Sequence, residues 1–336
     1  MPGKRVTLDL PLAPLYTHTQ ITMPMQVLHG KKPGPALFVS AAIHGDEING
    51  VEIIRRLLKM KFLNKLSGTF IAVPIVNVYG FLNRSRYLPD RRDLNRSFPG
   101  SKQGSLTGRL AYLFMQEVVH HCTHGIDLHT GAFHRANLPQ IRGALDDKET
   151  LRLAKAFGTP IMVHSDFRDG SLRQLARESG LTTLLYEGGE ALRFDEVAIR
   201  AGVKGILNVM RTIGMLKALP ERQSVFEPVI ALNSQWVRAP ISGLLRSMVP
   251  LGSRVERDQE LGTLSDPFGE REVAIRAPFK GIVIGKTNIP LANEGEALFH
   301  IAHFSKARPA QRALKTFQEE LNPEEALGPS GEPPIF

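Results

Sequence analysis

The chain has 336 residues, of which 42% are hydrophobic, so it can form two globular domains or one large domain with an appendage. Its net charge is +9, but the arginines are scattered and aromatic residues are few, which argues against a base-stacking surface for nucleic acid. A single cysteine, Cys122, excludes an internal disulfide framework. Residues 4–14 lack an uninterrupted apolar core, so we expect neither a leader nor a membrane span and assign the protein to the cytoplasm.

The first informative stretch is the apolar run at residues 36–43, which predicts a buried strand after a strand at 21–28 and a turn at 30–35. The run ends at His44, and Glu47 follows three residues later. A tight turn at Gly45 would let the imidazole and the carboxylate converge at the start of a helix over 46–60. These ligand types suit Zn²⁺, and a catalytic zinc needs a third protein ligand and one open position.

The next elements are a buried strand at 69–76 and an irregular loop at 77–104 that is too long for a simple connector. This loop contains the densest group of arginines in the chain, which are Arg84, Arg86, Arg91, Arg92 and Arg96. Arginine binds carboxylates through two parallel hydrogen bonds, so the loop favours a small anionic substrate.

A helix at 106–119 precedes a short apolar strand at 125–129, in which Asp127 and His129 alternate onto the same face. His129 is the best candidate for the third zinc ligand. Asp127 would then orient a ligand imidazole or the metal-bound water, since metal-bound histidines commonly have such acidic partners. His164, at the end of a strand over 160–164, is a weaker candidate because three ligands are already supplied.

A helix at 171–178 is followed by a strand at 182–186 that carries Glu187 at its end. A carboxylate beside the metal site can take a proton from water and deliver it to a leaving amine. Glu187 is therefore the predicted general base, and Glu190 is the alternative. The last predicted element of this part is a helix over 195–216.

Four motifs occur in a fixed order: His-Gly-Asp-Glu at 44–47, Asp-Leu-Asn-Arg at 93–96, Asp-Leu-His-Thr at 127–130 and Glu-Gly-Gly at 187–189. In this order they resemble the succinylglutamate desuccinylase/aspartoacylase family, which has the zinc-carboxypeptidase-like fold, over the first two thirds of the chain. The resemblance implies an α/β fold with a mixed, largely parallel sheet flanked by helices. It also implies zinc-dependent hydrolysis of an N-acyl amino acid or a similar small amide, with one Zn²⁺ per chain.

The resemblance also assigns roles to individual residues. Glu187 occupies the position of the family's catalytic glutamate, and Asn95 and Arg96 match the pair that holds the substrate carboxylate. Arg86 is our choice for the arginine that polarises the scissile carbonyl, although Arg91 and Arg92 lie closer to the motif in sequence. Arg173 is a second carboxylate anchor by its place before Glu187, with Arg177 as the rival.

The composition changes at 220–223, and the rest of the chain is rich in short β signals. The sequence at 239–245 returns in similar form at 277–283, which resembles the two halves of a biotinyl/lipoyl-type barrel-sandwich. The expected hairpin at 267–271 lacks the lysine that a carrier domain modifies. We thus expect a catalytic domain at 1–220, an all-β domain at 221–304 and a tail at 305–336.

The leading prediction is a zinc amidohydrolase that removes an acyl group from a small anionic N-acyl amino acid. A carboxypeptidase acting on a peptide or peptidoglycan fragment is the alternative within enzymes, and a non-catalytic binding module is the alternative outside them. The β domain is expected either to narrow the entrance to the zinc site or to mediate contacts in a homo-oligomer.

Overall fold

The computed structural model describes residues 2–166, 168–219, 227–231, 233–304 and 307–321. A mixed sheet crosses the molecule, and its core strands run parallel. Its strands, in spatial order, are β1 (Lys4–Pro11), β2 (Thr22–His29), β4 (Ser67–Val73), β3 (Lys32–Ala41), β5 (His124–Gly131), β8 (Thr182–Glu190), β6 (Arg135–Gly143), β15 (Gly281–Thr287), β17 (Ala297–His303) and β10 (Asn233–Arg238). Three short strands join its side: β7 (Ile161–His164), β9 (Val229–Ala231) and β12 (Arg254–Val255).

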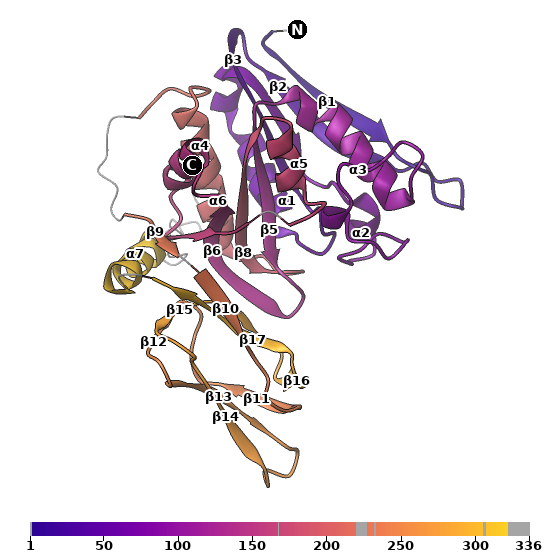
Figure 1. The fold of residues 1–336 in the computed structure, drawn as a ribbon. Helices are drawn as coiled ribbons and strands as arrows, with labels where there is room; N and C mark the ends of the chain where they lie inside the picture. Colours follow the sequence, from indigo (N-terminus) through magenta and orange to yellow (C-terminus); the bar gives the residue numbers. More distant parts are fainter. Residues whose placement is uncertain (1, 167, 220–226, 232, 305–306, 322–336) are drawn as a thin grey trace, which may run out of the picture.

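Helices cover both faces of the parallel core, as expected for an α/β fold (Figure 1). The side chains of α1 (Asn49–Lys59), α4 (Lys148–Phe157) and α6 (Glu196–Thr212) share one apolar cluster with alternate residues of the strands. The opposite cluster contains α3 (Leu106–Glu117) and α5 (Leu172–Glu178). This alternation follows from the two-residue period of a strand, and it confirms the predicted fold class.

Local sequence signals fix the ends of these helices. Ser105, Asp147, Ser171 and Asp195 are the N-caps of α3, α4, α5 and α6, and each side chain accepts a hydrogen bond from a backbone N–H of the first turn. Gly158 ends α4 in the left-handed conformation, with φ of 84°.

Several boundaries differ from the sequence predictions. The first helix begins at Asn49 instead of residue 46, so Glu47 lies in the preceding turn. Strand β8 continues to Glu190, which places Glu187 inside the strand instead of beyond its end. The loop at 77–104 contains the short helix α2 (Val78–Leu82) and the 3₁₀ turn η2 (Leu94–Arg96). The remaining 3₁₀ turns are η1 (Lys61–Lys65) and η3 (Val119–His121).

The C-terminal part consists of a small antiparallel sheet together with strands that extend the main sheet. The small sheet contains β14 (Glu272–Arg276), β13 (Glu260–Ser265), β11 (Gly243–Ser247) and β16 (Leu291–Ala292). Strand β15 pairs with β6, so hydrogen bonds connect the two parts of the chain directly. The expected boundary at 220–223 lies outside the described residues, as does the segment after 321. Within the expected tail, α7 (Ala307–Glu320) packs against β9 and β15.

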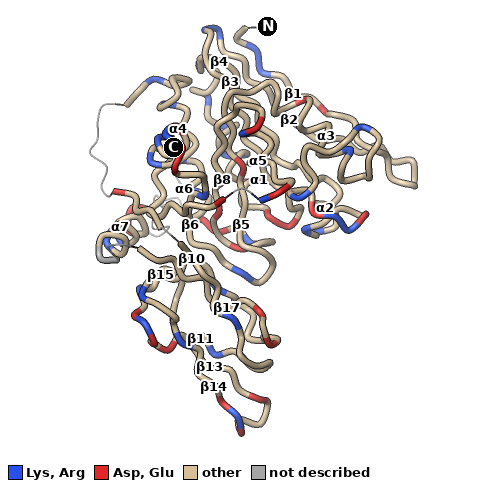
Figure 2. The backbone as a smooth tube through the Cα atoms, in the orientation of Figure 1, with Lys and Arg blue, Asp and Glu red and all other residues tan. Residues whose placement is uncertain are grey.

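Figure 2 marks the Lys and Arg positions along the backbone, and they are spread over both parts of the chain. Among the described residues, no helix is long and apolar enough to cross a membrane. Cys122 is buried directly after η3, and burial raises the pKa of its thiol to about 12.

Candidate active site

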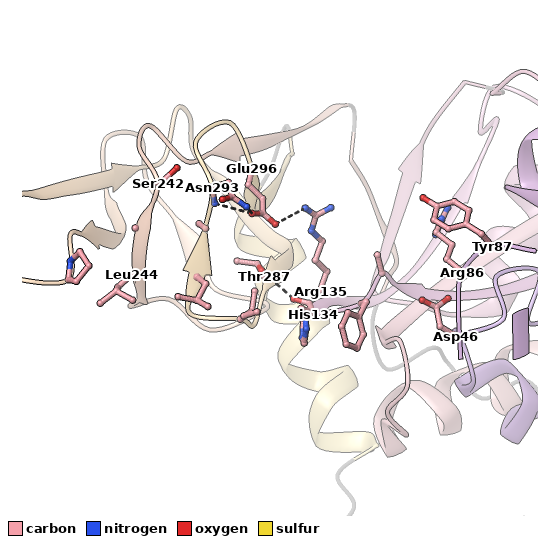
Figure 3. A pocket seen from close by; sticks show the side chains of 17 residues that line it. Asp46, Arg86, Tyr87, His134, Arg135, Ser242, Leu244, Thr287, Asn293 and Glu296 are labelled. Carbon is pink, nitrogen blue, oxygen red and sulfur yellow. Dashed lines mark hydrogen bonds and ion pairs between the residues drawn. The ribbon is translucent and has the colours of Figure 1, made fainter. Parts of the chain in front are cut away.

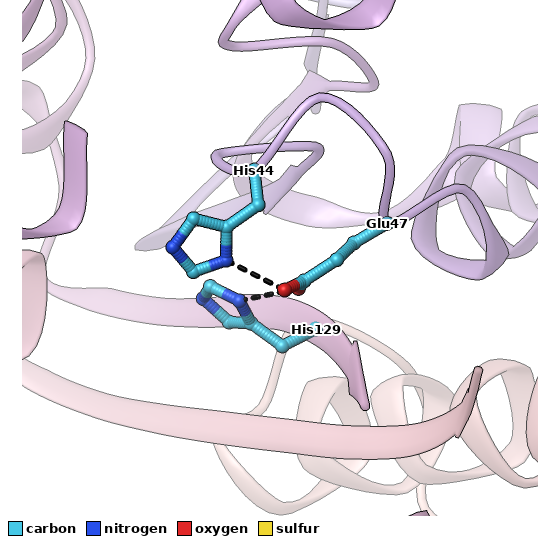
Figure 4. Close-up of side chains that lie close together, drawn as sticks. All are labelled: His44, Glu47 and His129. Atoms are coloured by element: carbon cyan, nitrogen blue, oxygen red, sulfur yellow. Dashed lines mark hydrogen bonds and ion pairs between the residues drawn. The ribbon is translucent and has the colours of Figure 1, made fainter. Parts of the chain in front are cut away.

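The carboxyl-terminal ends of β3 and β5 bring three buried polar side chains together. His44 lies in the turn after β3, Glu47 lies just before α1, and His129 lies near the end of β5. The Nδ1 atoms of His44 and His129 lie 2.6 Å and 2.7 Å from the Oε1 and Oε2 atoms of Glu47 (Figure 4). We call these three residues the triad.

The outer nitrogen of each triad imidazole lies against a carboxylate. His129 Nε2 is 2.8 Å from Asp127 Oδ2, and the Ser40 hydroxyl donates to the other oxygen of Asp127. His44 Nε2 is 3.2 Å from Asp93 Oδ1. Asp127 therefore lies where the sequence places a partner of a ligand imidazole. Asp93 has the same relation to His44, but the sequence alone did not suggest a role for it.

Burial and charge act in opposite directions on the triad. Burial by itself would lower the pKa of both histidines, but neighbouring carboxylates raise it: Glu47 and Asp93 at His44, and Asp127 and Glu47 at His129. Burial by itself would raise the pKa of Glu47, yet the two imidazoles hold it below the usual range. The Glu47 carboxylate thus favours positive charge on both imidazoles. A divalent cation bound between the three groups would supply that positive charge in place of the protons.

The triad fits a catalytic zinc site. It offers two imidazole nitrogens and one carboxylate oxygen, which is a donor set found in zinc hydrolases. These ligand atoms all lie within 4.8 Å of one another. The Nε2 contacts with Asp93 and Asp127 leave Nδ1 as the inward-facing atom of both imidazoles.

Arg86 is the arginine of the long loop that reaches the triad. Its Nη1 lies 3.2 Å from Glu47 Oε1, and its Nη2 lies 3.1 Å from Asp93 Oδ2. Arg91 and Arg92 are exposed. The helix cap at Asn77 helps to explain this placement, because the Asn77 side chain donates a hydrogen bond to the carbonyl of Arg86.

Glu187 lies beside the triad on the next strand of the sheet, directly opposite His129 of β5. Asn137 of β6 donates a hydrogen bond to Glu187 Oε2, and Arg142 Nε lies 3.6 Å from Glu187 Oε1. Glu190, the alternative base, instead accepts a hydrogen bond from Asn288 of the C-terminal part. Of the two glutamates, Glu187 has the position beside the triad.

The three predicted substrate-binding residues are Asn95, Arg96 and Arg173. The Asn95 N–H donates to Asp93 Oδ1, the carboxylate oxygen that also contacts His44 Nε2. Asn95 Oδ1 accepts the N–H of Leu172 at the start of α5. Arg96 is exposed, and its guanidinium donates to the Asn95 carbonyl. Arg173 donates to Ser165 Oγ and to the carbonyl of Asp166, at 3.0 Å and 2.8 Å.

Sequence reasoning missed strand β6 and with it Asn137, Gln140 and Arg142. A signal existed, because Gln140, Ile141 and Arg142 alternate between polar and apolar, as a half-buried strand does. Gln140 is directly opposite Glu187 in the sheet. These residues extend the site on the side of Glu187 away from the triad.

A cavity of about 800 Å³ lies between the rim of the metal site and the C-terminal part (Figure 3). Asp46, Arg86 and Tyr87 line one side of it, and Ser242, Leu244, Asn293 and Glu296 belong to the lining on the other side. Arg135 Nη2 and Glu296 Oε1, 3.7 Å apart, form an ion pair across the junction. Both parts of the chain therefore line this cavity, which borders the metal site at Asp46 and Arg86.

Residues 33–213, more than half of the chain, match the family model of the succinylglutamate desuccinylase/aspartoacylase catalytic domain. The chain belongs to this family. Family membership confirms the predicted hydrolase acting on amide bonds and sets aside the non-catalytic alternative. The triad is a His-Glu-His metal site typical of this zinc-dependent family.

Similarity to individual proteins extends beyond the catalytic domain. The N-alpha-acetyl-L-2,4-diaminobutyric acid deacetylase of Halomonas elongata is 29% identical over 285 residues, covering 80% of this chain and 82% of the relative. The product-bound structure of the ectoine utilization protein EutE (DoeB) from Ruegeria pomeroyi has a TM-score of 0.80 and 25% identity, covering 90% of this chain and 97% of that chain. A succinylglutamate desuccinylase/aspartoacylase from Rhodobacter sphaeroides has a TM-score of 0.81 and 23% identity, covering 90% and 96%.

Proposed function

We propose that the protein is a zinc-dependent deacylase that removes the acyl group from an N-acyl amino acid, with Nα-acetyl-L-2,4-diaminobutyrate as the first substrate to test. The observation that carries the proposal is the buried triad with Arg86 on one side and Glu187 on the other. The 29% identity to a deacetylase of that substrate supports the choice of acyl amino acid.

One zinc ion per chain would be held by His44 Nδ1, His129 Nδ1 and a carboxylate oxygen of Glu47. A zinc bound there supplies a Lewis acid that activates water and polarises the scissile carbonyl. The carboxylates of Asp93 and Asp127 keep both imidazoles oriented for this task, because each holds an Nε2 atom.

Three side chains of the protein have separate roles in the remaining steps of the reaction. Arg86 stabilises the negative charge that develops on the carbonyl oxygen, because its guanidinium is fixed beside the triad by Glu47 and Asp93. Glu187 takes a proton from the attacking water and returns it to the nitrogen of the leaving amine. Asn137 orients Glu187 for both transfers through its hydrogen bond to Oε2.

The C-terminal part limits the substrate to small molecules under this proposal. Its residues line the cavity in front of the triad, and β15 continues the main sheet from β6. An extended peptide would have to pass these residues to reach the triad. The arrangement therefore favours a deacylase over the alternative carboxypeptidase.

Hydrolysis assays on zinc-loaded protein test the proposal. The panel contains N-acetyl, N-succinyl and N-formyl amino acids, including Nα-acetyl-L-2,4-diaminobutyrate, alongside dipeptides and longer peptides. We expect turnover of one acyl class and little turnover of peptides. Preferred cleavage of peptides would contradict the deacylase assignment and support the carboxypeptidase.

A further inference from the structure

Strand β1 forms one free edge of the main sheet (Figure 1). All of its residues pair with β2, and it pairs with no other described strand. Only Leu10 is partly buried, and the apolar residues Val6 and Leu8 are 43% and 40% exposed. A long edge strand with unpaired backbone groups readily pairs with another strand, and proteins commonly protect such edges by shortening, bending or charging them.

The register of β1 decides which of its backbone groups face outward. The Leu12 N–H donates to the Ile21 carbonyl, and the pairing of β1 with β2 has the same register. In an antiparallel pair, residues that turn both backbone groups toward the partner strand alternate with residues that turn both away. The even-numbered residues of β1 therefore bond to β2. The N–H and C=O groups of Arg5, Thr7 and Asp9 point away from the sheet.

The sequence of β1 is complementary to itself when two copies run antiparallel. Because the outward-facing residues are odd-numbered, they can only oppose odd-numbered residues of the second copy. With a two-fold axis at Thr7, Arg5 of each copy lies opposite Asp9 of the other, and Val6 lies opposite Leu8. Directly opposed pairs of this kind stabilise an antiparallel ladder. An axis at Arg5 or Asp9 would oppose like charges, and an axis at Val6 or Leu8 would form neither ion pair.

The charged side chains at the ends of this ladder are suited to such pairs. Asp9 is exposed and makes no hydrogen bond or ion pair within the described part of the chain. Arg5 donates from Nε to Gln26 Oε1 and from Nη1 to the Leu58 carbonyl, at 2.8 Å and 2.7 Å. These bonds use two of its five N–H donors and order the guanidinium on the face where the opposing carboxylate would lie.

We propose that β1 joins two copies of this chain into a homodimer with one continuous sheet. The interface would be isologous, because the same strand serves both copies. Strand β1 runs in the same direction as β3 and β5, so the two-fold axis would place the two metal sites at opposite ends of the joined sheet. Two strands, β2 and β4, separate β1 from β3. The interface is therefore independent of the proposed function.

Strand β14 is the matched comparison within the C-terminal part. It is the outer strand of the small sheet, and its sequence also has opposite charges at its two ends, Glu272 and Arg276. Its apolar Ile275 is buried, however, and Arg276 already donates to Glu260 Oε2 and to the Asp258 carbonyl. Pairing at β14 would bury less new apolar surface than pairing at β1, so the structure favours β1.

Sedimentation velocity of the full-length, zinc-loaded protein over a concentration series tests the interface. The wild type should sediment as a dimer that dissociates on dilution. Arg5→Asp and Asp9→Arg should each raise the dimer Kd at least roughly tenfold, because each change converts both symmetric ion pairs into like-charge contacts. The double variant exchanges the two charges and should restore most of the wild-type affinity.

Proline substitutions compare the two free edges. Thr7→Pro removes an outward N–H and keeps the backbone hydrogen bonds to β2, so it should also weaken the dimer. Ala274→Pro makes the matched change in β14. Its N–H also points outward, because the Asp266 N–H donates to the Arg271 carbonyl and the odd-numbered residues of β14 therefore bond to β13. This control should leave the dimer intact.

A wild type that is monomeric at every concentration would overturn the proposal. A dimer that neither charge reversal weakens would also overturn it, as would a double variant that dissociates like the single ones. Loss of the dimer in Ala274→Pro but not in Thr7→Pro would place the interface on β14 instead. Circular dichroism and thermal melting identify a variant that has lost its fold, in which case the remaining variants decide on the same criterion.

Discussion

The two sides of Glu187 differ in how completely their polar groups are paired. On the triad side, all four nitrogens of His44 and His129 contact carboxylates, and Arg86 closes the network. On the Arg142 side, buried amide and guanidinium atoms make no hydrogen bonds to the described residues. The first arrangement suits a cation that stays in place through every turnover.

The largest effect should come from removing a triad ligand. His129→Ala should release stoichiometric zinc and lower activity by roughly a thousandfold or more, because the Lewis acid contributes several kcal/mol of transition-state stabilisation. Metal analysis of the purified variant measures the first effect and a hydrolysis assay the second. His120→Ala removes an exposed histidine and serves as the control. Retention of stoichiometric zinc in His44→Ala, Glu47→Ala and His129→Ala alike would refute the triad as the metal site.

A smaller effect is expected from changing Glu187, which lies between the triad side and the Arg142 side. Glu187→Gln keeps the size of the side chain and its contact with Asn137 but removes the base, so turnover should fall at least roughly a hundredfold while zinc remains bound. The measurement is kcat at saturating substrate in zinc-replete protein. Glu190→Gln is the matched control and should remain near wild type. If the two variants exchanged these phenotypes, the base would have to be reassigned to Glu190.

The smallest effect is a pH dependence of stability on the Arg142 side. Since the pKa of His300 is lowered to about 3 in the fold, the unfolded chain takes up the proton first as the pH falls below about 6.5. The stabilisation is therefore complete at pH 7 and is lost toward pH 3, by at most about 1.4 kcal/mol per pH unit. His300→Gln should flatten this loss.

Denaturant unfolding of the metal-free protein at pH 7 and pH 5 measures this loss of stability. Between these two pH values, the free energy of unfolding of His300→Gln should fall by about 1–2 kcal/mol less than that of the wild type. His120→Gln, at an exposed position, provides the comparison and should follow the wild type. Identical pH dependence in His300→Gln and wild type would show that His300 contributes nothing to acid destabilisation.

The residues at the ends of β3 and β5 could be predicted from the sequence because their signals are local. An apolar run predicts a strand, the polar residues after it lie at its carboxyl end, and a spacing of three residues lets His44 and Glu47 converge. The same reasoning identified Asp127, His129 and Glu187 as site candidates. These signals depend on strand periodicity and on the turn at Gly45, which neighbouring residues largely determine.

Only the tertiary structure decided what surrounds the site residues at the ends of β3 and β5. Strand β6 lies antiparallel between β8 and β15, and this register places Asn137, Gln140 and Arg142 beside Glu187, 45 or more positions away in the sequence. The resemblance favoured Arg86 over Arg91 and Arg92, and the path of the long loop brings its side chain to Glu47 and Asp93. Strand order and loop path result from packing between distant segments, and no periodicity within either segment records them.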